Sequence, residues 1–179
     1  VHATGVLHRD VKPSNILIRR NGMPLLSDFG LARDTASPHL TVTTSFIGTM
    51  AYASPEQLRG DARIDERSDV YSLGATLFHA LLLRVPTNAP TPQAALAQIV
   101  DGKPLAVLQQ QAHLPPALAD TIGRAMARDP LRRYATAADF AAALEAYLRN
   151  NPVPLRRSRV PVRPVGSTRR LLWGGGAVV

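Results

Sequence analysis

The 179-residue sequence contains no cysteine. A chain without cysteine can form neither a disulfide framework nor a thiolate metal site. Histidine is scarce as well, and its five positions lack the spacing of zinc ligands, so we expect no structural zinc site. These positions are His2, His8, His39, His79 and His113.

Acidic residues are missing from the end of the chain. Residues 151–179 contain six arginines and no acid, whereas residues 1–150 contain 15 basic and 13 acidic residues. The formal net charge of +8 therefore belongs mostly to the tail, and the rest of the chain is nearly neutral. The tail also has only Trp173 for stacking on bases. We therefore expect no nucleic-acid partner.

The sequence also lacks a secretory signal, because its first residues do not combine a charged start with an apolar run. Residues 171–179 are apolar, but nine helical residues reach about 13 Å, short of the roughly 30 Å of a bilayer core. We expect this end either to begin a transmembrane helix that continues past residue 179 or to be a flexible terminus. The chain has no initiator methionine, and we expect it to be a fragment.

Apolar patterning predicts a mainly α-helical body with a small antiparallel β-hairpin. The stretch 68–83 is apolar on all sides and carries Asp69 in its first turn, which is typical of a helix buried in a core. Apolar residues spaced by three and four predict further helices at about 92–101, 115–127 and 137–149. The last of these begins with Thr136-Ala-Ala-Asp139, which has the form of a capping box.

The hairpin is predicted by Asn21-Gly22, which separates two short apolar runs. If these are the two turn residues, cross-strand partners have numbers that sum to 43, and Asn15 faces Asp28 with side chains about 5 Å apart. Pro24 cannot donate to a strand ladder, so we expect an edge hairpin whose register could slip by one residue.

Four motifs follow one another along the chain. They are His8-Arg9-Asp10-Val-Lys12-Pro-Ser-Asn15, Asp28-Phe29-Gly30, Gly48-Thr49 and Ser54-Pro55-Glu56. In order and spacing they resemble the C-terminal lobe of bacterial-type (Hanks-type) Ser/Thr protein kinases. The resemblance covers about residues 1–150, and it implies a catalytic loop at 8–15 and an activation segment at 28–56. Four linked motifs are far more specific than any one of them alone.

The resemblance implies transfer of the γ-phosphoryl group of ATP to Ser or Thr hydroxyls of proteins, with ATP and Mg²⁺ as cofactors. Asp10 would accept the hydroxyl proton, and Lys12 would contact the transferring phosphate. Asn15 and Asp28 would hold magnesium, which prefers oxygen ligands. Thr49 resembles the threonine that hydrogen-bonds the acid and the lysine in such enzymes.

Regulatory and structural residues are implied in the same way. Arg9 resembles the arginine that pairs with a phosphate on the activation loop, and Thr41 and Thr43 resemble the pair autophosphorylated in bacterial receptor-like kinases. A phosphate there would add about −1.5 to −2 charge. The implied structural residues are Asp69, which would anchor the catalytic loop, and the buried ion pair of Glu56 and Arg133.

The family's glycine-rich loop, strand lysine and helix glutamate have no counterpart in this sequence, so its N-terminal lobe is missing. We expect the chain alone to have little or no activity, because adenine would have only half a pocket. The alternative is a non-catalytic kinase-like module that scaffolds partners. The intact set of acid, lysine, asparagine and second acid favours the enzyme, because a degenerate site has no chemical need for all four.

Residues 151–170 are rich in Pro, Val and Arg and read as a basic linker. Arginines before an apolar stretch follow the positive-inside pattern. If the chain continues past residue 179, we expect a juxtamembrane segment on the cytoplasmic side of a single-pass membrane protein. If it does not continue, we expect a cytoplasmic protein. The candidate partners are ATP, protein substrates, a second copy of the kinase and an anionic membrane surface.

Overall fold

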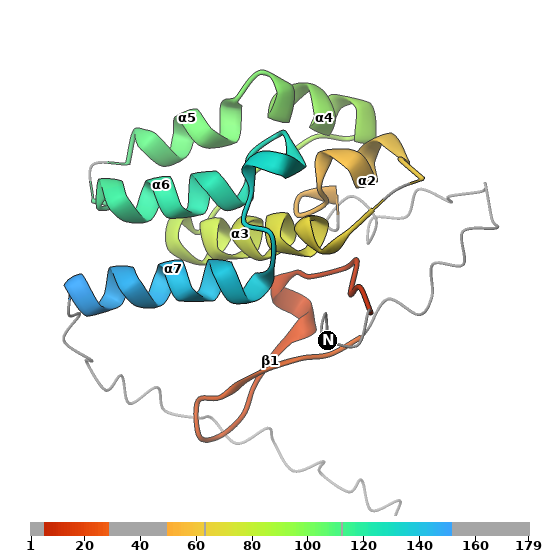
Figure 1. Ribbon diagram of the computed structural model, residues 1–179. Coiled ribbons are helices and arrows are strands. Elements are labelled where there is room, and N and C mark those ends of the chain that lie inside the picture. Colours follow the sequence, from red (N-terminus) through yellow and green to blue (C-terminus); the bar gives the residue numbers. More distant parts are fainter. Residues whose placement is uncertain (1–5, 29–49, 63, 112, 152–179) are drawn as a thin grey trace, which may run out of the picture.

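The computed structural model describes residues 6–28, 50–62, 64–111 and 113–151. In these residues six α-helices form one body, and a two-stranded antiparallel hairpin lies beside it (Figure 1). The predicted fold class is therefore confirmed. Within the described ranges, no helix is long and apolar enough to cross a membrane. The predicted linker from residue 152 onward and the apolar end lie outside these ranges.

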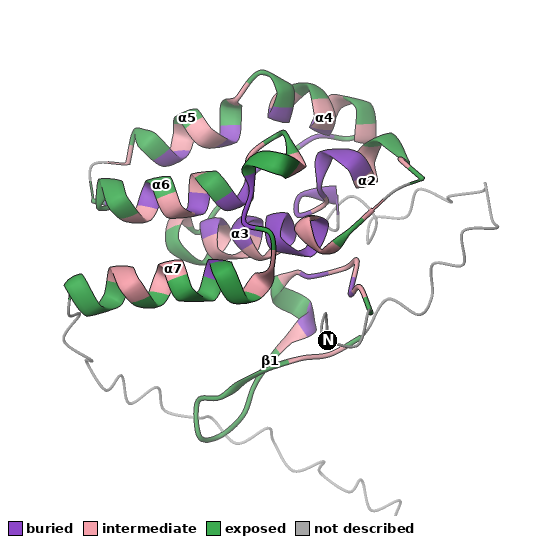
Figure 2. Cartoon of the chain, viewed as in Figure 1, coloured by how far each residue is buried: buried purple, intermediate pink, exposed green. Residues whose placement is uncertain are grey.

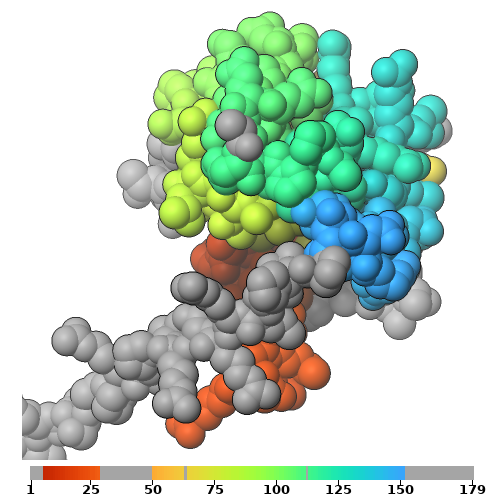
Figure 3. All heavy atoms as spheres, turned by 90° about the vertical axis from the view of Figure 1, so that its left-hand side faces the viewer, coloured from red at the N-terminus to blue at the C-terminus, as the bar shows by residue number. Residues whose placement is uncertain are grey.

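The hairpin follows directly on a single 3₁₀ turn. The turn is η2 (Pro13–Asn15), and the strands are β1 (Ile16–Ile18) and β2 (Pro24–Leu26). As expected for an edge strand, Pro24 needs no ladder hydrogen bond from its own nitrogen. The apolar strand side chains are poorly covered, and Ile18 is 66% exposed. A space-filling view shows the hairpin projecting from the helical body (Figure 3).

The hairpin register differs by one residue from the predicted register. The paired residues have numbers that sum to 42, not 43. The loop contains three residues rather than two, and its last residue, Gly22, has a left-handed φ of 83°, as is usual for three-residue hairpin loops. Asn15 consequently lies opposite Ser27, whose amide donates to the Asn15 carbonyl at 2.8 Å. The predicted pairing of Asn15 with Asp28 is wrong.

The predicted buried helix is α3 (Glu66–Leu82), which lies at the centre of the helical body (Figure 1). Most of its buried residues lie in its first turns (Figure 2). Tyr71 and Phe78 are each 1% exposed. Asp65 caps its first turn by accepting a hydrogen bond from the Arg67 amide at 2.9 Å. The end of the apolar stretch leaves the core, since Leu83 is 85% exposed.

The other helices surround α3. Three were predicted: α4 (Pro92–Val100), α6 (Pro116–Ala125) and α7 (Ala137–Asn150). The predicted capping box of Thr136 and Asp139 is present at the start of α7. Three shorter elements were not predicted: α2 (Pro55–Arg59), α5 (Lys103–Gln109) and the 3₁₀ turn η3 (Pro130–Arg132). They are too short to show an apolar period.

The core is tightest where α3 crosses α6. A Cβ atom added at Gly74 of α3 would lie 2.9 Å from Met126 Cγ and 3.0 Å from Ala125 Cβ. The missing side chain at Gly74 therefore allows the close approach of the two helices. Ala125 also belongs to a second buried cluster, in which Tyr134 stacks on Phe140 of α7 with ring centroids 5.3 Å apart.

Candidate active site

Asp10, Lys12 and Asn15 come together in the loop that precedes the hairpin. Lys12 Nζ lies 2.9 Å from Asp10 Oδ2. Asn15 Nδ2 donates to the Asp10 backbone carbonyl at 2.9 Å and to Asp10 Oδ2 at 3.2 Å. The turn η2 brings these side chains together, because the backbone amide of Asn15 donates to the Lys12 carbonyl at 3.0 Å. A proton acceptor, a cation and an amide thus share one small site.

The backbone of this loop is held by Asp69, which is buried in the first turn of α3. Asp69 Oδ2 accepts from the His8 amide and Asp69 Oδ1 accepts from the Arg9 amide, both at 2.8 Å. Arg9 has a φ of 65°, a left-handed conformation that costs free energy for a residue other than glycine. The two hydrogen bonds from α3 stabilise this conformation directly before Asp10.

His8 connects the loop to the end of the hairpin. The side chain is 1% exposed. Its Nε2 lies 2.9 Å from the Ser27 carbonyl, and its Nδ1 lies 3.3 Å from the Asp10 amide nitrogen. A neutral ring with its proton on Nε2 satisfies both contacts, because Nε2 then donates and Nδ1 accepts. His8 is therefore a packed structural residue beside the site.

Asp28 follows β2 at the same end of the hairpin as Asn15. It is exposed and has a left-handed φ of 56°. The Ser27 hydroxyl lies 3.2 Å from the Asn15 carbonyl and 3.4 Å from Asp28 Oδ2, so it is placed between the two. Phe29 and Gly30, the rest of that motif, lie outside the described residues.

The donor set of Asn15 and Asp28 fits magnesium. Asn15 uses its amide nitrogen on Asp10, so its Oδ1, which also lies 3.4 Å from the Ser14 hydroxyl, is the atom that could bind a metal, and Asp28 could supply carboxylate oxygens. Magnesium is held in proteins by one or two such oxygen ligands together with substrate phosphates. In the described residues there is no cluster of three or more His, Asp or Glu side chains that could hold a metal by itself.

Glu56 and Arg133 form a buried bidentate ion pair. Arg133 Nη1 donates to Glu56 Oε1 at 2.7 Å and Nη2 donates to Oε2 at 2.8 Å, and the Arg133 side chain is fully buried. The Ser68 hydroxyl also donates to Glu56 Oε1. Burial alone would raise the pKa of Glu56, but the hydrogen bonds and positive charge of Arg133, with the Ser68 hydrogen bond, lower it to about 2. The pair links α2 to η3.

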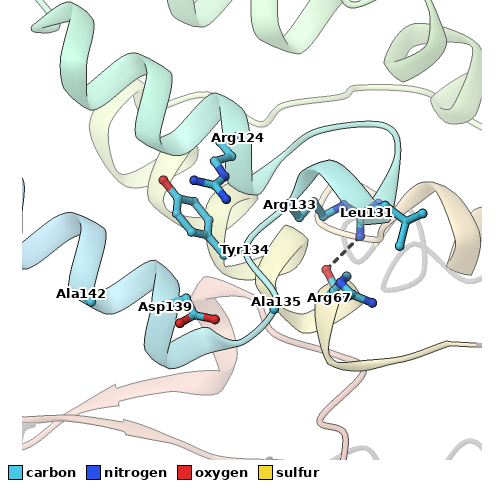
Figure 4. A pocket seen from close by; sticks show the side chains of 8 residues that line it. All are labelled: Arg67, Arg124, Leu131, Arg133, Tyr134, Ala135, Asp139 and Ala142. Atoms are coloured by element: carbon cyan, nitrogen blue, oxygen red, sulfur yellow. Dashed lines mark hydrogen bonds between the residues drawn. The ribbon is translucent and has the colours of Figure 1, made fainter.

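A pocket of about 410 Å³ lies beside this ion pair (Figure 4). Its lining residues are Arg67, Arg124, Leu131, Arg133, Tyr134, Ala135, Asp139 and Ala142. Arg67 pairs with Asp65 at 2.8 Å. The Arg124 guanidinium lies 4.3 Å from the centroid of the Tyr134 ring. The arginines that line the pocket therefore already contact groups of this chain. The loop that contains Asp10 does not line the pocket.

Two contacts that the sequence did not predict connect α2 and the residues just before it to the rest of the molecule. The Tyr52 hydroxyl lies 2.5 Å from His79 Nδ1, and burial raises the pKa of Tyr52. Gln57 Nε2 donates to the Arg9 carbonyl at 2.8 Å. A signal for α2 was present, because Ser54-Pro-Glu-Gln57 has the form of a capping box, but side-chain contacts over this distance leave no local pattern.

Several predicted residues cannot be compared with the structure. Thr41, Thr43 and Thr49 lie outside the described residues. Arg9 is described, and its backbone is part of the site. Its predicted partner, a phosphate on the activation loop, would lie in the segment that is not described.

Comparison with known proteins identifies the family. The protein kinase domain family matches residues 1–144, and the chain belongs to this family. Serine/threonine-protein kinase PknB of Mycolicibacterium smegmatis is 41% identical over 145 residues, which cover 80% of this chain and 23% of that protein. Serine/threonine-protein kinase PknK of Mycobacterium tuberculosis is 43% identical over 171 residues, which cover 94% of this chain and 15% of that protein.

A third relative, probable serine/threonine-protein kinase SCO3848 of Streptomyces coelicolor, is 36% identical over 154 residues, which cover 85% of this chain and 23% of that protein. The resemblance to bacterial Ser/Thr kinases is confirmed by these relatives. The chain spans less than a quarter of the length of each of the three.

Proposed function

We propose that the chain is the catalytic C-terminal part of a Ser/Thr protein kinase that transfers the γ-phosphoryl group of ATP to Ser or Thr hydroxyls of proteins. The observation that carries this proposal is the convergence of Lys12 and Asn15 on Asp10, whose oxygens lie 2.9 Å from Lys12 Nζ and 2.9 to 3.2 Å from Asn15 Nδ2. The hydrogen bonds of Asp69 to the loop backbone support it, because they hold the acid in a fixed place.

Asp10 acts as the proton acceptor in this proposal. Lys12 and Asn15 both contact its Oδ2, which restricts the orientation of the carboxylate. As the acceptor hydroxyl attacks the γ-phosphorus, its proton passes to the Asp10 carboxylate and the bond from phosphorus to the ADP oxygen breaks. Lys12 balances the negative charge on the transferring phosphoryl oxygens.

Asn15 and Asp28 would hold Mg²⁺. The ion would supply positive charge that offsets the negative charge of the phosphate groups of ATP. The hydrogen bonds from Asn15 Nδ2 to Asp10 fix the amide plane, so the metal-binding oxygen and the proton acceptor keep a constant relation. The Ser27 hydroxyl, at the end of β2, contacts both the Asn15 carbonyl and the Asp28 carboxylate. It therefore helps to hold the two proposed metal ligands in a constant relation.

The isolated 179-residue chain is proposed to have little activity. It carries the acid, the lysine and the metal ligands, but its sequence has no glycine-rich loop to cover the phosphates of ATP. A full-length protein that supplies such a loop would be active. A non-catalytic scaffold would instead stay inactive at full length although its loop residues are intact.

The Asp10→Asn variant of the full-length protein tests the proposal. We expect incorporation of phosphate from labelled ATP into a Ser/Thr substrate to fall by about 10²- to 10⁴-fold, because the variant lacks the proton acceptor. The matched control is Asp120→Asn, which removes an exposed acid on α6 and should leave the rate unchanged. Equal rates in wild type and Asp10→Asn would reject Asp10 as the base, and an inactive wild type would favour the scaffold.

A further inference from the structure

The side chain of Gln57 makes two kinds of hydrogen bond at once. Its Oε1 accepts from the Ser54 amide at 2.9 Å and from the Ser54 hydroxyl at 3.1 Å, which completes the capping box of α2. Its Nε2 donates to the backbone carbonyl of Arg9 at 2.8 Å, although the two residues are 48 positions apart. One amide group therefore both caps a helix and contacts the catalytic loop.

The acceptor carbonyl belongs to the peptide group that connects Arg9 to Asp10. At the other end of this peptide group, the Asp10 amide lies 3.3 Å from His8 Nδ1. The peptide before Arg9 is held as well, because the Arg9 amide donates to Asp69. The left-handed Arg9 is thus fixed on both sides, and only the contact from Gln57 comes from α2. The direction in which the Asp10 side chain leaves the backbone depends on this peptide plane.

We propose that Gln57 is a positioning residue: through the Arg9 carbonyl it makes the orientation of Asp10 depend on the first turn of α2. This inference rests on the proposed kinase function. The first two residues of α2, Pro55 and Glu56, are the last two of the predicted activation segment, 28–56, and Gln57 follows them directly.

Two variants separate the capping function of Gln57 from its contact with the loop. Gln57→Glu keeps an acceptor oxygen for Ser54 at a position where Glu commonly completes a capping box, but it replaces the Nε2 donor by a second oxygen, which cannot donate to the Arg9 carbonyl. Ser54→Ala removes the hydroxyl of the capping box and keeps the Gln57 donor. Gln93→Glu, at an exposed position on α4, controls for the added negative charge.

In the full-length protein we expect Gln57→Glu to lower kcat by about 10- to 100-fold, because a small misplacement of a reacting group has effects of this size. KM for ATP and for the peptide substrate should stay within about twofold, and Tm should stay near that of the wild type. Ser54→Ala should lower Tm while kcat stays within about threefold, and Gln93→Glu should change neither. The inference is overturned if Gln57→Glu has the kcat of the wild type, or if Ser54→Ala loses as much kcat as Gln57→Glu.

Hydrogen exchange provides a test that does not need activity. The amides of Arg9 and Asp10 should exchange about 3- to 10-fold faster in Gln57→Glu than in Ser54→Ala, as expected for the loss of one hydrogen bond. If the wild type transfers no phosphate, the proposed kinase function fails and exchange alone decides the role of Gln57. Equal exchange in the two variants would then overturn the inference.

Discussion

Single residues are held by groups from distant parts of the chain, and the Glu56–Arg133 pair is a deeply buried example. Both side chains are almost fully excluded from solvent. Arg133 also donates to the carbonyls of Ala127 and Arg67, at 2.8 Å each. Breaking such a pair leaves the other charge buried without a counterion, which costs far more than losing a surface pair.

Replacing Arg133 tests this. We expect Arg133→Met to lower the free energy of unfolding by about 3 to 5 kcal/mol, because Glu56 then stays buried without its counterion. Its neighbour Arg132 is exposed, so Arg132→Met should change stability by no more than about 0.5 kcal/mol. Chemical denaturation of both variants measures the difference. Equal stabilities would show that the pair adds nothing to the fold.

The same pair should make stability depend on pH. The pKa of Glu56 falls from its ordinary value of 4.5 to about 2 in the folded protein, so folding favours the deprotonated form. Its contribution is complete above about pH 4.5 and is lost as the pH falls toward 2. Between pH 5 and 3 the wild type should lose more stability than Glu56→Gln, whose side chain does not titrate. Parallel pH profiles in denaturation experiments would contradict this.

At the scale of elements, the contact of α3 with α6 depends on one glycine. Gly74→Ala should destabilise the protein by about 1 to 3 kcal/mol, because the new methyl group overlaps Met126 and Ala125. This outweighs the gain of about 1 kcal/mol that alanine gives inside a helix.

The control for this substitution is Gly123→Ala on α6. Its added methyl group would be 3.7 Å from the nearest side-chain atom, which is ordinary van der Waals contact. Here the helix preference of alanine is not opposed, so stability should rise by up to about 1 kcal/mol. Thermal unfolding of the two variants should therefore give shifts of opposite sign. Two shifts of the same sign would mean that the close approach of α3 and α6 does not determine the effect of Gly74→Ala on stability.

The long elements could be predicted from the sequence, because apolar spacing and the capping box at Thr136 are local signals. The hairpin was predicted, but its register was not, since Asn-Gly fits both a two-residue loop and a three-residue loop that ends in a left-handed glycine. The helices α2 and α5 span only five and seven residues, too few for a period. In the site, the anchor Asp69 and the Glu56–Arg133 pair followed from the resemblance.

At the scale of the whole molecule, the loop and hairpin are separated in sequence from the helical body by the predicted activation segment. Residues 29–49 connect the end of the hairpin to the approach to α2. Residues on each side of this connection contact the loop: Ser27 contacts His8 and Asn15, and Gln57 of α2 contacts Arg9.

Autophosphorylation is tested on the full-length protein. After incubation with ATP and magnesium, we expect mass spectrometry to find phosphate on Thr41 or Thr43, and none on either in Asp10→Asn. Each phosphate would add about −1.5 to −2 charge, which Arg9 can balance. The control is Thr91, an exposed threonine at the start of α4, which should stay unmodified. Absence of phosphate from both Thr41 and Thr43 in an active protein would reject the proposal.

The attachment of the loop of Asp10 to α3 through Asp69 also affects where inactivating substitutions should fall in the sequence. The helix that fills the centre of the molecule is the same helix that carries the loop's fixed point. In a random-mutagenesis screen for loss of the proposed kinase activity, inactive variants should therefore map to interior positions of α3 as often as to the loop itself. Tolerance to mutation would be lowest along that helix, even where no side chain can reach a substrate.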